Sequence, residues 1–352
     1  MKKRPSAEQI AGLLRQADVD LGEGVTVADV GRRLGVSQQT HQLQPHDSQR
    51  QLPHRTALRN QTRRRITAAI AGIPAESSLF RLAAYALHCQ AFVFRHRRWP
   101  SSPDREFNDF LFSRKVNGSL SDPLCRFVTD KEHGKTFIAE RVGAHRTIPT
   151  VAILRSPREI DDFRADGWPL VAKPTHSSGR KAIIEDQQEL SLAIPMMRDW
   201  LEHCYFRVSL ELNYRDLERK VIVERYLPDT FPFEGSIYCR DGQPRVISII
   251  DRRTDDKTRV SLDGQGRPVH FALGRRYFPM PDPELPYLET LMAEAAVLAE
   301  RFAFIRVDFY GSPTDFQFGE LTNLPAAALG RFDSPAGAAE FNGAFFAPLP
   351  LA

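Results

Sequence analysis

The sequence predicts an α+β protein, and three observations support this fold class. From Ser78 onward, short apolar runs alternate with amphipathic segments of helical period. The pair Asp241-Gly242 separates two of the apolar runs, as in the tight turn of a β-hairpin. The composition, 42% hydrophobic and 26% charged, is that of an ordinary globular chain. Together these features exclude a collagen, a coiled-coil rod and a wholly disordered protein.

The helices and strands of the body are predicted from the period of their apolar residues. Helices are expected at 79–94 and 285–302. Strands are expected at 170–173, 221–224, 236–239, 245–250, 304–309 and 316–320. The longest apolar segment, 79–94, contains Arg81, His88 and Gln90 and is shorter than the ~18 residues that a membrane helix requires. We therefore expect no membrane span.

The N-terminal segment and the cysteines indicate the cellular compartment of the protein. The opening Met-Lys-Lys-Arg leads into a polar amphipathic pattern, without the apolar core of a secretory signal. The cysteines, Cys89, Cys125, Cys204 and Cys239, form no Cys-x-x-Cys pair, so neither a disulfide framework nor a zinc site is indicated. We expect a cytoplasmic protein.

The net charge of +4 is unevenly distributed. Residues 1–75 carry 12 Lys and Arg against 6 Asp and Glu, whereas the remainder carries 36 against 38. The basic character therefore belongs to the front of the chain and indicates nothing about the larger body.

Residues 1–40 have the pattern of a helix-turn-helix. Ser6 begins one amphipathic helix, and Thr26 and Ser37 can cap two further helices around a turn at Gly35. The segment resembles the small N-terminal DNA-binding module of insertion-sequence transposases, and the similarity stops at Thr40. It is interpreted as a remnant of that module.

Residues 41–75 are predicted to form a basic, disordered linker. They hold six arginines, five glutamines and three histidines with few aliphatic residues, too few to bury a core. The run Arg63 to Arg65 could contact nucleic acid, although a solvated basic run is the commoner explanation. Binding of DNA through residues 1–75 is therefore an alternative function.

The most informative residues lie near the C-terminus. Arg306-Val-Asp308 is followed by a Gly-Ser-Pro turn and a second strand that ends at Glu320, so two carboxylates are expected on neighbouring strands. Paired oxygen ligands suit Mg²⁺, Asn323 could add a third oxygen, and Arg306 could meet a phosphate. The spacing equally allows a surface ion pair of Arg306 with Asp308 and an unrelated strand-end charge at Glu320.

Upstream residues favour a nucleotide site. Lys173 lies in an apolar strand, where a lysine requires an anionic partner. The loop 175–179, Thr-His-Ser-Ser-Gly, is rich in hydrogen-bond donors. The strand at 221–224 leads into Arg225-Tyr226-Leu227, where backbone groups could meet an adenine edge. Each feature alone has a simpler explanation, since such a loop is usually a turn and Tyr226 is more often a packing residue.

The order of these motifs resembles the ATP-grasp superfamily, and within it the TupA-like family associated with teichuronopeptide biosynthesis. The similarity covers about residues 93–335 and is carried by Thr-Asp-Lys131, Ile-Pro149-Thr, Lys173 before its loop, V-I-V-E-R-Y-L, R-V-D-F-Y and F-G-E-L-T-N-L-P. It implies an ATP-grasp fold of two α+β subdomains that clasp a nucleotide. The expected subdomains are a helical lead-in at 76–150, a lid at 151–228 and a metal-binding part at 229–345.

The resemblance also implies ATP and Mg²⁺ as cofactors and assigns roles to individual residues. Lys131 and Lys173 would bind phosphates, and the loop of Ser177, Ser178 and Gly179 would cover them. The adenine hinge would comprise Glu224, Tyr226 and Leu227, the metal ligands Asp308, Glu320 and Asn323, and the catalytic arginine Arg306. Two departures stand out: Thr322 replaces an asparagine frequent in ATP-grasp enzymes, and Ala326 to Ala328 replace a glycine-rich loop.

The implied reaction joins a carboxylate to an amine through an acyl phosphate, on a cell-envelope polysaccharide, peptidyl polymer or precursor. The protein would contribute positioning and charge neutralisation rather than a nucleophile. A catalytically inactive nucleotide-binding relative is a further alternative because of the alanine-rich loop. His176 is expected to be a surface or loop residue. The helix 79–94 with Arg95, Arg97, Arg98 and Trp99 is expected to pack on the body, with an anionic membrane surface as the alternative.

Overall fold

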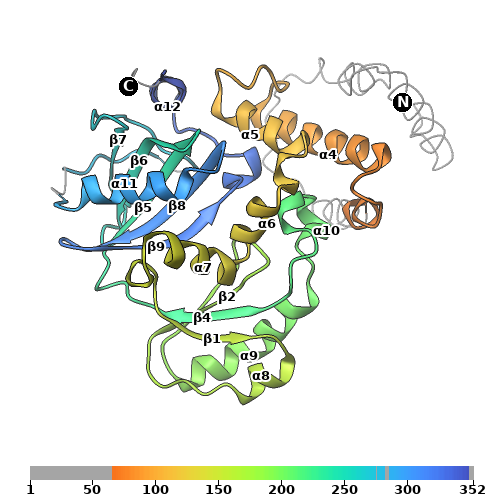
Figure 1. The fold of residues 1–352 in the computed structure, drawn as a ribbon, viewed down its shortest axis with the longest axis vertical. Coiled ribbons are helices and arrows are strands. Elements are labelled where there is room, and N and C mark those ends of the chain that lie inside the picture. Colours follow the sequence, from red (N-terminus) through yellow and green to blue (C-terminus); the bar gives the residue numbers. More distant parts are fainter. Residues whose placement is uncertain (1–65, 275, 282–284, 349–352) are drawn as a thin grey trace, which may run out of the picture. The chain divides into compact units, whose positions relative to one another are not determined.

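The computed structural model describes residues 66–274, 276–281 and 285–348 (Figure 1). The chain divides into two compact units, one of residues 1–100 with 207–210 and one of residues 101–206 with 211–352. The predicted helix-turn-helix at 1–40 lies outside the described residues, as does the predicted linker up to residue 65. The subdomain boundaries expected at 76–150, 151–228 and 229–345 stay predictions.

The described part of the first unit is helical. Helix α4, Ser78–His96, confirms the helix predicted at 79–94; it begins where the Ser77 hydroxyl accepts a hydrogen bond from the Phe80 N–H. Residues 66–71 are also helical, which corrects the prediction of disorder up to residue 75. Two side chains of this segment, Thr67 and Ile70, are buried. No described helix is long and apolar enough to cross a membrane.

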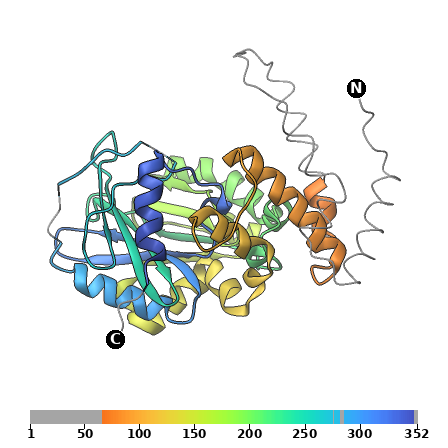
Figure 2. The same ribbon diagram turned by 90° about the horizontal axis from the view of Figure 1, so that it is seen from above.

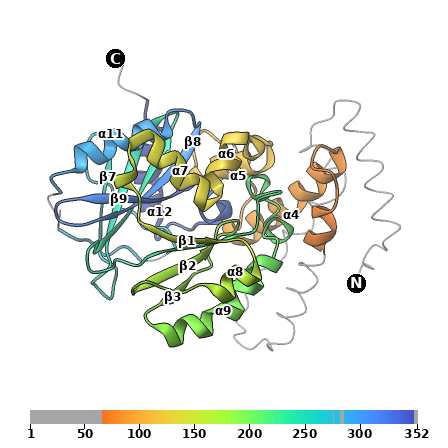
Figure 3. The same ribbon diagram turned by 60° about the horizontal axis from the view of Figure 1, so that its bottom comes forward.

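The second unit contains two antiparallel sheets. The smaller sheet has the strand order β1-β4-β2-β3, with β1 Thr150–Leu154, β2 Leu170–Pro174, β3 Ala182–Ile184 and β4 Val221–Arg225. Helices α8, Pro157–Asp162, and α9, Gln187–Glu202, cover one face (Figure 3). Their residues Met197 and Trp200 share a core with Leu170 and Val223 of the sheet.

The larger sheet has the order β7-β6-β5-β8-β9. Its strands are β5 Phe233–Arg240, β6 Gln243–Asp251, β7 Arg259–Asp263, β8 Phe304–Gly311 and β9 Phe316–Thr322. Asp241 and Gly242 join β5 to β6 with φ of 50° and 76°, the positive angles of a primed hairpin turn. The six predicted strands are thus confirmed, whereas β1, β3 and β7 were not foreseen.

Two helices cover opposite faces of this sheet because its side chains alternate. On one face Leu291 of α11, Leu288–Ala299, packs with Val307. Helix α12, Pro335–Phe346, lies on the other face (Figure 2). There the ring of Phe341 contacts the ring of Tyr238. The face that α12 covers also carries Asp308, which lies farther along β8 and stays open to a pocket.

The remaining elements lie outside the two sheets. They are α5 Phe107–Val116, α6 Pro123–Thr129, α7 Lys131–Val142 and α10 Phe206–Ser209, with single turns at Ser119–Ser121, Ala144–Arg146, Leu212–Tyr214 and Pro325–Ala328. Asp130 caps α7 by accepting hydrogen bonds from the N–H groups of Glu132 and His133. Helix α7 contacts both α11 and β9, so its first turn lies near the sheet edge.

Candidate nucleotide and metal site

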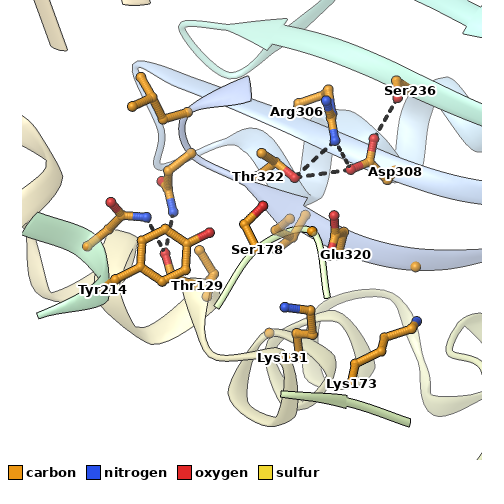
Figure 4. Close-up of a pocket in the computed structure, with 18 of the residues that line it drawn as sticks. Thr129, Lys131, Lys173, Ser178, Tyr214, Ser236, Arg306, Asp308, Glu320 and Thr322 are labelled. Atoms are coloured by element: carbon orange, nitrogen blue, oxygen red, sulfur yellow. Dashed lines mark hydrogen bonds and ion pairs between the residues drawn. The ribbon is translucent and has the colours of Figure 1, made fainter. Parts of the chain in front are cut away.

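A cavity of about 500 Å³ lies between the two sheets and collects most of the predicted site residues (Figure 4). The smaller sheet contributes Lys173, and the larger sheet contributes Arg306, Asp308 and Glu320. Further lining residues come from helices α6 and α7 and from three connecting segments; they include Thr129, Lys131, Lys135, Ser178, Gly179, Tyr205, Glu211, Asn213, Tyr214, Asn323, Ala326 and Ala327. Residues from 129 to 327 thus meet in one pocket.

A β-bulge brings the two carboxylates together. Asp308 lies directly opposite Glu320, but the next pair is Phe309 with Phe318, so Gly319 is the extra residue. Without the bulge, Phe318 and Glu320 would share a face, since side chains alternate along a strand. With it, Phe318 enters the core and Glu320 enters the pocket.

The two carboxylates differ in their partners. Asp308 accepts hydrogen bonds from the Ser236 hydroxyl (2.6 Å), from the Arg306 guanidinium (2.6 Å) and from the Thr322 hydroxyl (3.1 Å). Glu320 makes no hydrogen bond or ion pair with any residue that the structure describes, although it lines the pocket. The Glu320 carboxylate is therefore available to bind a cationic ligand.

The pKa values of this pair shift in opposite directions. Burial, reinforced by the neighbouring Glu320, raises the pKa of Asp308. Burial also opposes ionisation of Glu320, but Lys131, Arg306 and Lys173 outweigh it and hold the pKa of Glu320 below its ordinary value. Glu320 is thus ionised at neutral pH and faces a ring of cations.

Both predicted phosphate lysines line the pocket. The Lys131 ammonium, on the first turn of α7, donates to the carbonyls of Pro174 (3.2 Å) and Ser177 (2.6 Å). Burial lowers the pKa of Lys131, with the Glu320 carboxylate opposing the effect. Figure 4 shows Lys131 and Lys173 on the same side of the pocket, across from Glu320 and Asp308.

Lys173 belongs to a buried ion-pair chain that the sequence did not reveal. The Glu224 carboxylate receives Lys173 at 2.7 Å and Lys135 at 2.5 Å. Burial favours neutral Lys173, but the Glu224 carboxylate more than compensates, so the pKa of Lys173 is raised. Lys135 is more deeply enclosed and burial lowers its pKa. Lys135 lies one helical turn after Lys131, and this spacing was the available signal for it.

The predicted hinge residues line a smaller cavity of about 80 Å³ beside Lys173. The Tyr226 N–H donates to the Pro169 carbonyl, and the Tyr226 hydroxyl accepts from Arg252 at 3.0 Å. The Leu227 N–H has no hydrogen-bond partner among the described residues. Leu227 and the buried Phe231 supply apolar walls to this cavity, whose other lining residues include Lys173, Lys181 and Glu224.

The loop after Lys173 is only partly exposed. Thr175, His176 and Ser177 are buried, whereas Ser178 and Gly179 are exposed and line the pocket. His176 thus lies in a loop, as one part of the expectation had it, but it is buried rather than on the surface. Its Nε2 lies 3.1 Å from the carbonyls of both Trp200 and His203, and burial lowers its pKa.

Asn323 is anchored beside α6. Its amide nitrogen donates to the Cys125 carbonyl (2.8 Å) and the Thr129 hydroxyl (3.0 Å), while its buried Oδ1 has no partner among the described residues. Thr322, rather than Asn323, contacts Asp308. The role of Asn323 as a third metal ligand stays a prediction.

The alanine-rich loop adopts a glycine-like conformation. Ala326, Ala327 and Ala328 have φ of 48°, 56° and 63°, in the left-handed region. The Lys115 ammonium donates to the Ala327 carbonyl at 3.2 Å and pairs with Glu211 at 3.3 Å. Alanines thus hold the backbone shape for which glycines were expected.

Comparison with known proteins agrees with this architecture. A model of the TupA-like ATPgrasp family matches residues 112–338, which is more than half of the chain. No curated protein matches. Solved structures similar to the chain include a D-alanine–D-alanine ligase from Bacillus anthracis complexed with ATP (19% identity, 56% of this chain, 57% of that chain, TM-score 0.36) and an L-amino acid ligase from Bacillus licheniformis (12%, 76%, 62%, 0.42). The chain spans about three fifths of the length of each of those two proteins. At these TM-scores the similarity supports no conclusion about function.

The pocket between two antiparallel sheets and the family match place the chain in the ATP-grasp class of proteins. The chain belongs to the TupA-like ATP-grasp family. The predicted fold and family are thereby confirmed.

Proposed function

We propose that the protein is an ATP-dependent ligase that joins a carboxylate to an amine through an acyl phosphate. The observation that carries this proposal is the meeting of Lys131, Lys173, Asp308 and Glu320 around one cavity. ATP would place its adenine in the smaller cavity beside Leu227 and Phe231 and its phosphates between the two lysines. The γ-phosphoryl group would pass to the substrate carboxylate, and the amine would then displace phosphate.

The oxygen ligands fit Mg²⁺. Glu320 is an unpaired carboxylate, Asp308 lies opposite it, and the Asn323 Oδ1 is a buried acceptor without a described partner. Mg²⁺ bound there would neutralise phosphate charge. Arg306, held against Asp308, would stabilise the transferring phosphoryl group through its guanidinium. The exposed Ser178 and Gly179 would close over the phosphates, with Ser177 fixing the start of that loop.

The family resemblance favours a substrate in the cell envelope, a polysaccharide, peptidyl polymer or precursor that carries carboxylates. The pocket is consistent with an anionic substrate, since Arg180 and Lys181 are exposed at its edge. Localisation in the cytoplasm, where ATP is plentiful, is part of the same proposal.

Thermal unfolding of the full chain tests the nucleotide site. ATP or a nonhydrolysable analogue at 100 times its Kd should stabilise the folded state by about 2.7 kcal/mol, and only with Mg²⁺ present. Glu320→Gln should abolish the Mg²⁺-dependent part, whereas Glu234→Gln, also in the pocket lining but on β5, should retain it. Absence of any stabilisation of the wild-type chain at millimolar Mg²⁺-ATP would refute the proposal.

A further inference from the structure

The Lys131 ammonium is held by the backbone of the segment that ends β2 and follows it. It donates to the carbonyls of Pro174 (3.2 Å) and Ser177 (2.6 Å). An ammonium has three N–H donors, so two are used by these carbonyls and the third remains for a phosphate. The direction of the third donor depends on where the two carbonyls lie. The positions of Pro174 and Ser177 therefore set the orientation of the Lys131 ammonium.

The Pro174 end of this segment is fixed by the smaller sheet. Pro174 is the last residue of β2 and pairs with Val221 of β4. The Thr175 N–H donates to the Lys220 carbonyl at 2.9 Å. The Thr175 hydroxyl donates to the Asp130 carboxylate at 3.1 Å. Strand pairing and two hydrogen bonds thus hold this end in place.

The Ser177 end depends on the side chain of His176. The Ser177 hydroxyl is buried without a partner among the described residues, and Ser178 beyond it is exposed. His176 is 3% exposed, and its Nε2 lies 3.1 Å from the carbonyls of both Trp200 and His203 at the end of α9. Trp200 packs in the core of the smaller sheet, so these carbonyls belong to a well-packed helix end. His176 thus ties the second half of the segment to α9.

The surroundings of His176 also determine its protonation state. Carbonyls only accept hydrogen bonds, so Nε2 carries the hydrogen and Nδ1, buried without a described partner, is the unprotonated nitrogen. Burial lowers the pKa of His176; the two carbonyls and Asp130 oppose this effect, and the Lys131 ammonium adds to it. The ring is therefore neutral at pH 7, and it contributes one N–H that two carbonyls share.

We propose that His176 is a positioning residue for phosphate binding, because its Nε2–H fixes the Ser177 carbonyl relative to α9 and thereby orients the Lys131 ammonium. The proposal rests on the nucleotide site proposed above and adds to it a residue that lines neither cavity. The smaller cavity, proposed for adenine, includes none of residues 174–180 in its lining. Loss of the Nε2–H should therefore weaken binding through the phosphates and spare binding through adenosine.

Ligand-observed NMR titrations of the full chain test this role, with a nonhydrolysable ATP analogue plus Mg²⁺ and with adenosine as the two probes. His176→Leu removes the donor and should weaken binding of the analogue at least tenfold, with adenosine changed less than twofold. His176→Gln supplies an amide N–H in place of Nε2–H and should restore the affinity for the analogue to within threefold of wild type. His270→Leu is the control, since this histidine is 59% exposed and lines neither cavity; it should change neither affinity.

A double-mutant cycle with Lys131→Met tests whether His176 acts through Lys131. Lys131→Met alone should weaken binding of the analogue at least tenfold, and adding His176→Leu should weaken it less than twofold further. Losses that multiply in the double variant would overturn the positioning role. So would undiminished binding in His176→Leu, an equal loss of adenosine, or a loss in His176→Gln as large as in His176→Leu. A wild-type chain that does not bind the analogue would refute the nucleotide site itself, and the role of His176 with it.

Discussion

The ion-pair chain around Glu224 gives the sharpest stability prediction. The Glu224 carboxylate is 6% exposed and bridges Lys135, 10% exposed, and Lys173, 20% exposed. Glu224→Gln keeps the volume of the side chain but leaves two enclosed ammonium groups without their counter-charge. Breaking a buried ion pair from one side costs about 3–5 kcal/mol. For a unit of this size the melting temperature should fall by roughly 6–20 °C.

The measurement is thermal unfolding followed by calorimetry or circular dichroism at pH 7. Glu234→Gln is the matched control, because its carboxylate is 56% exposed and lies 3.9 Å from Arg252. It should change the free energy of unfolding by about 0.5 kcal/mol or less. Adding Lys135→Met to Glu224→Gln should recover part of the loss, since one uncompensated charge is then gone.

The pH dependence follows from the direction of the Glu224 pKa. Burial raises this pKa, but Lys173 and Lys135 outweigh it, so the folded-state pKa lies below the ordinary value for a glutamate. A carboxylate with a lowered pKa stabilises the fold above its unfolded pKa and loses that contribution as pH falls through the folded value. The stability difference between wild type and Glu224→Gln should therefore be full at pH 7 and shrink below about pH 4.5. An unchanged melting temperature in Glu224→Gln at pH 7 would refute the bridging role.

Three further predictions test other parts of the site. Glu320→Gln and Asp308→Asn should lower ATP turnover by orders of magnitude, as measured by phosphate release, and normal turnover in both would exclude them as metal ligands. Glu320→Gln should leave folding nearly intact, whereas Asp308→Asn should also lower stability, because Arg306 loses its counter-charge. Ala327→Gly should raise the free energy of unfolding by about 0.5–1 kcal/mol in a denaturant titration, because glycine relieves the left-handed strain at a smaller entropic cost. Lys220→Met should lower it by about 3 kcal/mol, because Lys220 is 0% exposed and pairs with Asp130; a neutral effect in the same titration would contradict that structural role.

The period of the apolar residues was sufficient to predict most strands of the larger sheet. Strands β5, β6, β8 and β9 combine alternation or continuous apolar runs with clear turns, which are local signals. Strands β1 and β3 have five and three residues, and their pairing depends on β4 and β2, distant in sequence. Such short segments acquire a structure from their partners, so periodicity alone does not reveal them.

The candidate site shows the same division between local and long-range information. The order of motifs placed Lys131, Lys173, Asp308 and Glu320 in one site, and the structure brings their side chains to one cavity. The residues that pair with them and shift their pKa values were not predictable, because these partners are distant in the sequence. Lys135 meets Glu224 across 89 positions. No sequence pattern of one element contains such a pair.

The structure changes the interpretation of the alanine-rich loop, Ala326 to Ala328. In the sequence, Ala326 to Ala328 suggested an inactive relative, because glycine adopts positive φ at the least cost. In the structure the alanines adopt positive φ nonetheless, and the Lys115 ammonium holds the Ala327 carbonyl. The alanines therefore keep the backbone conformation expected for glycines, although positive φ costs alanine more free energy than it costs glycine. The inactive alternative must then be tested by turnover, since conformation gives it no support.

The charges of the pocket also explain why metal and nucleotide should bind together. Each of the three cations that act on Glu320 already has a protein acceptor: Lys131 donates to two carbonyls, Lys173 pairs with Glu224, and Arg306 pairs with Asp308. Glu320 is the carboxylate among them without such a direct partner in the described chain. Free ATP would bring its negative phosphates toward this unpaired charge, which is unfavourable at short range. Mg²⁺-ATP reverses the sign of that contact, so stabilisation of the wild-type chain by ATP should require the metal, and Glu320→Gln should abolish the Mg²⁺-dependent part.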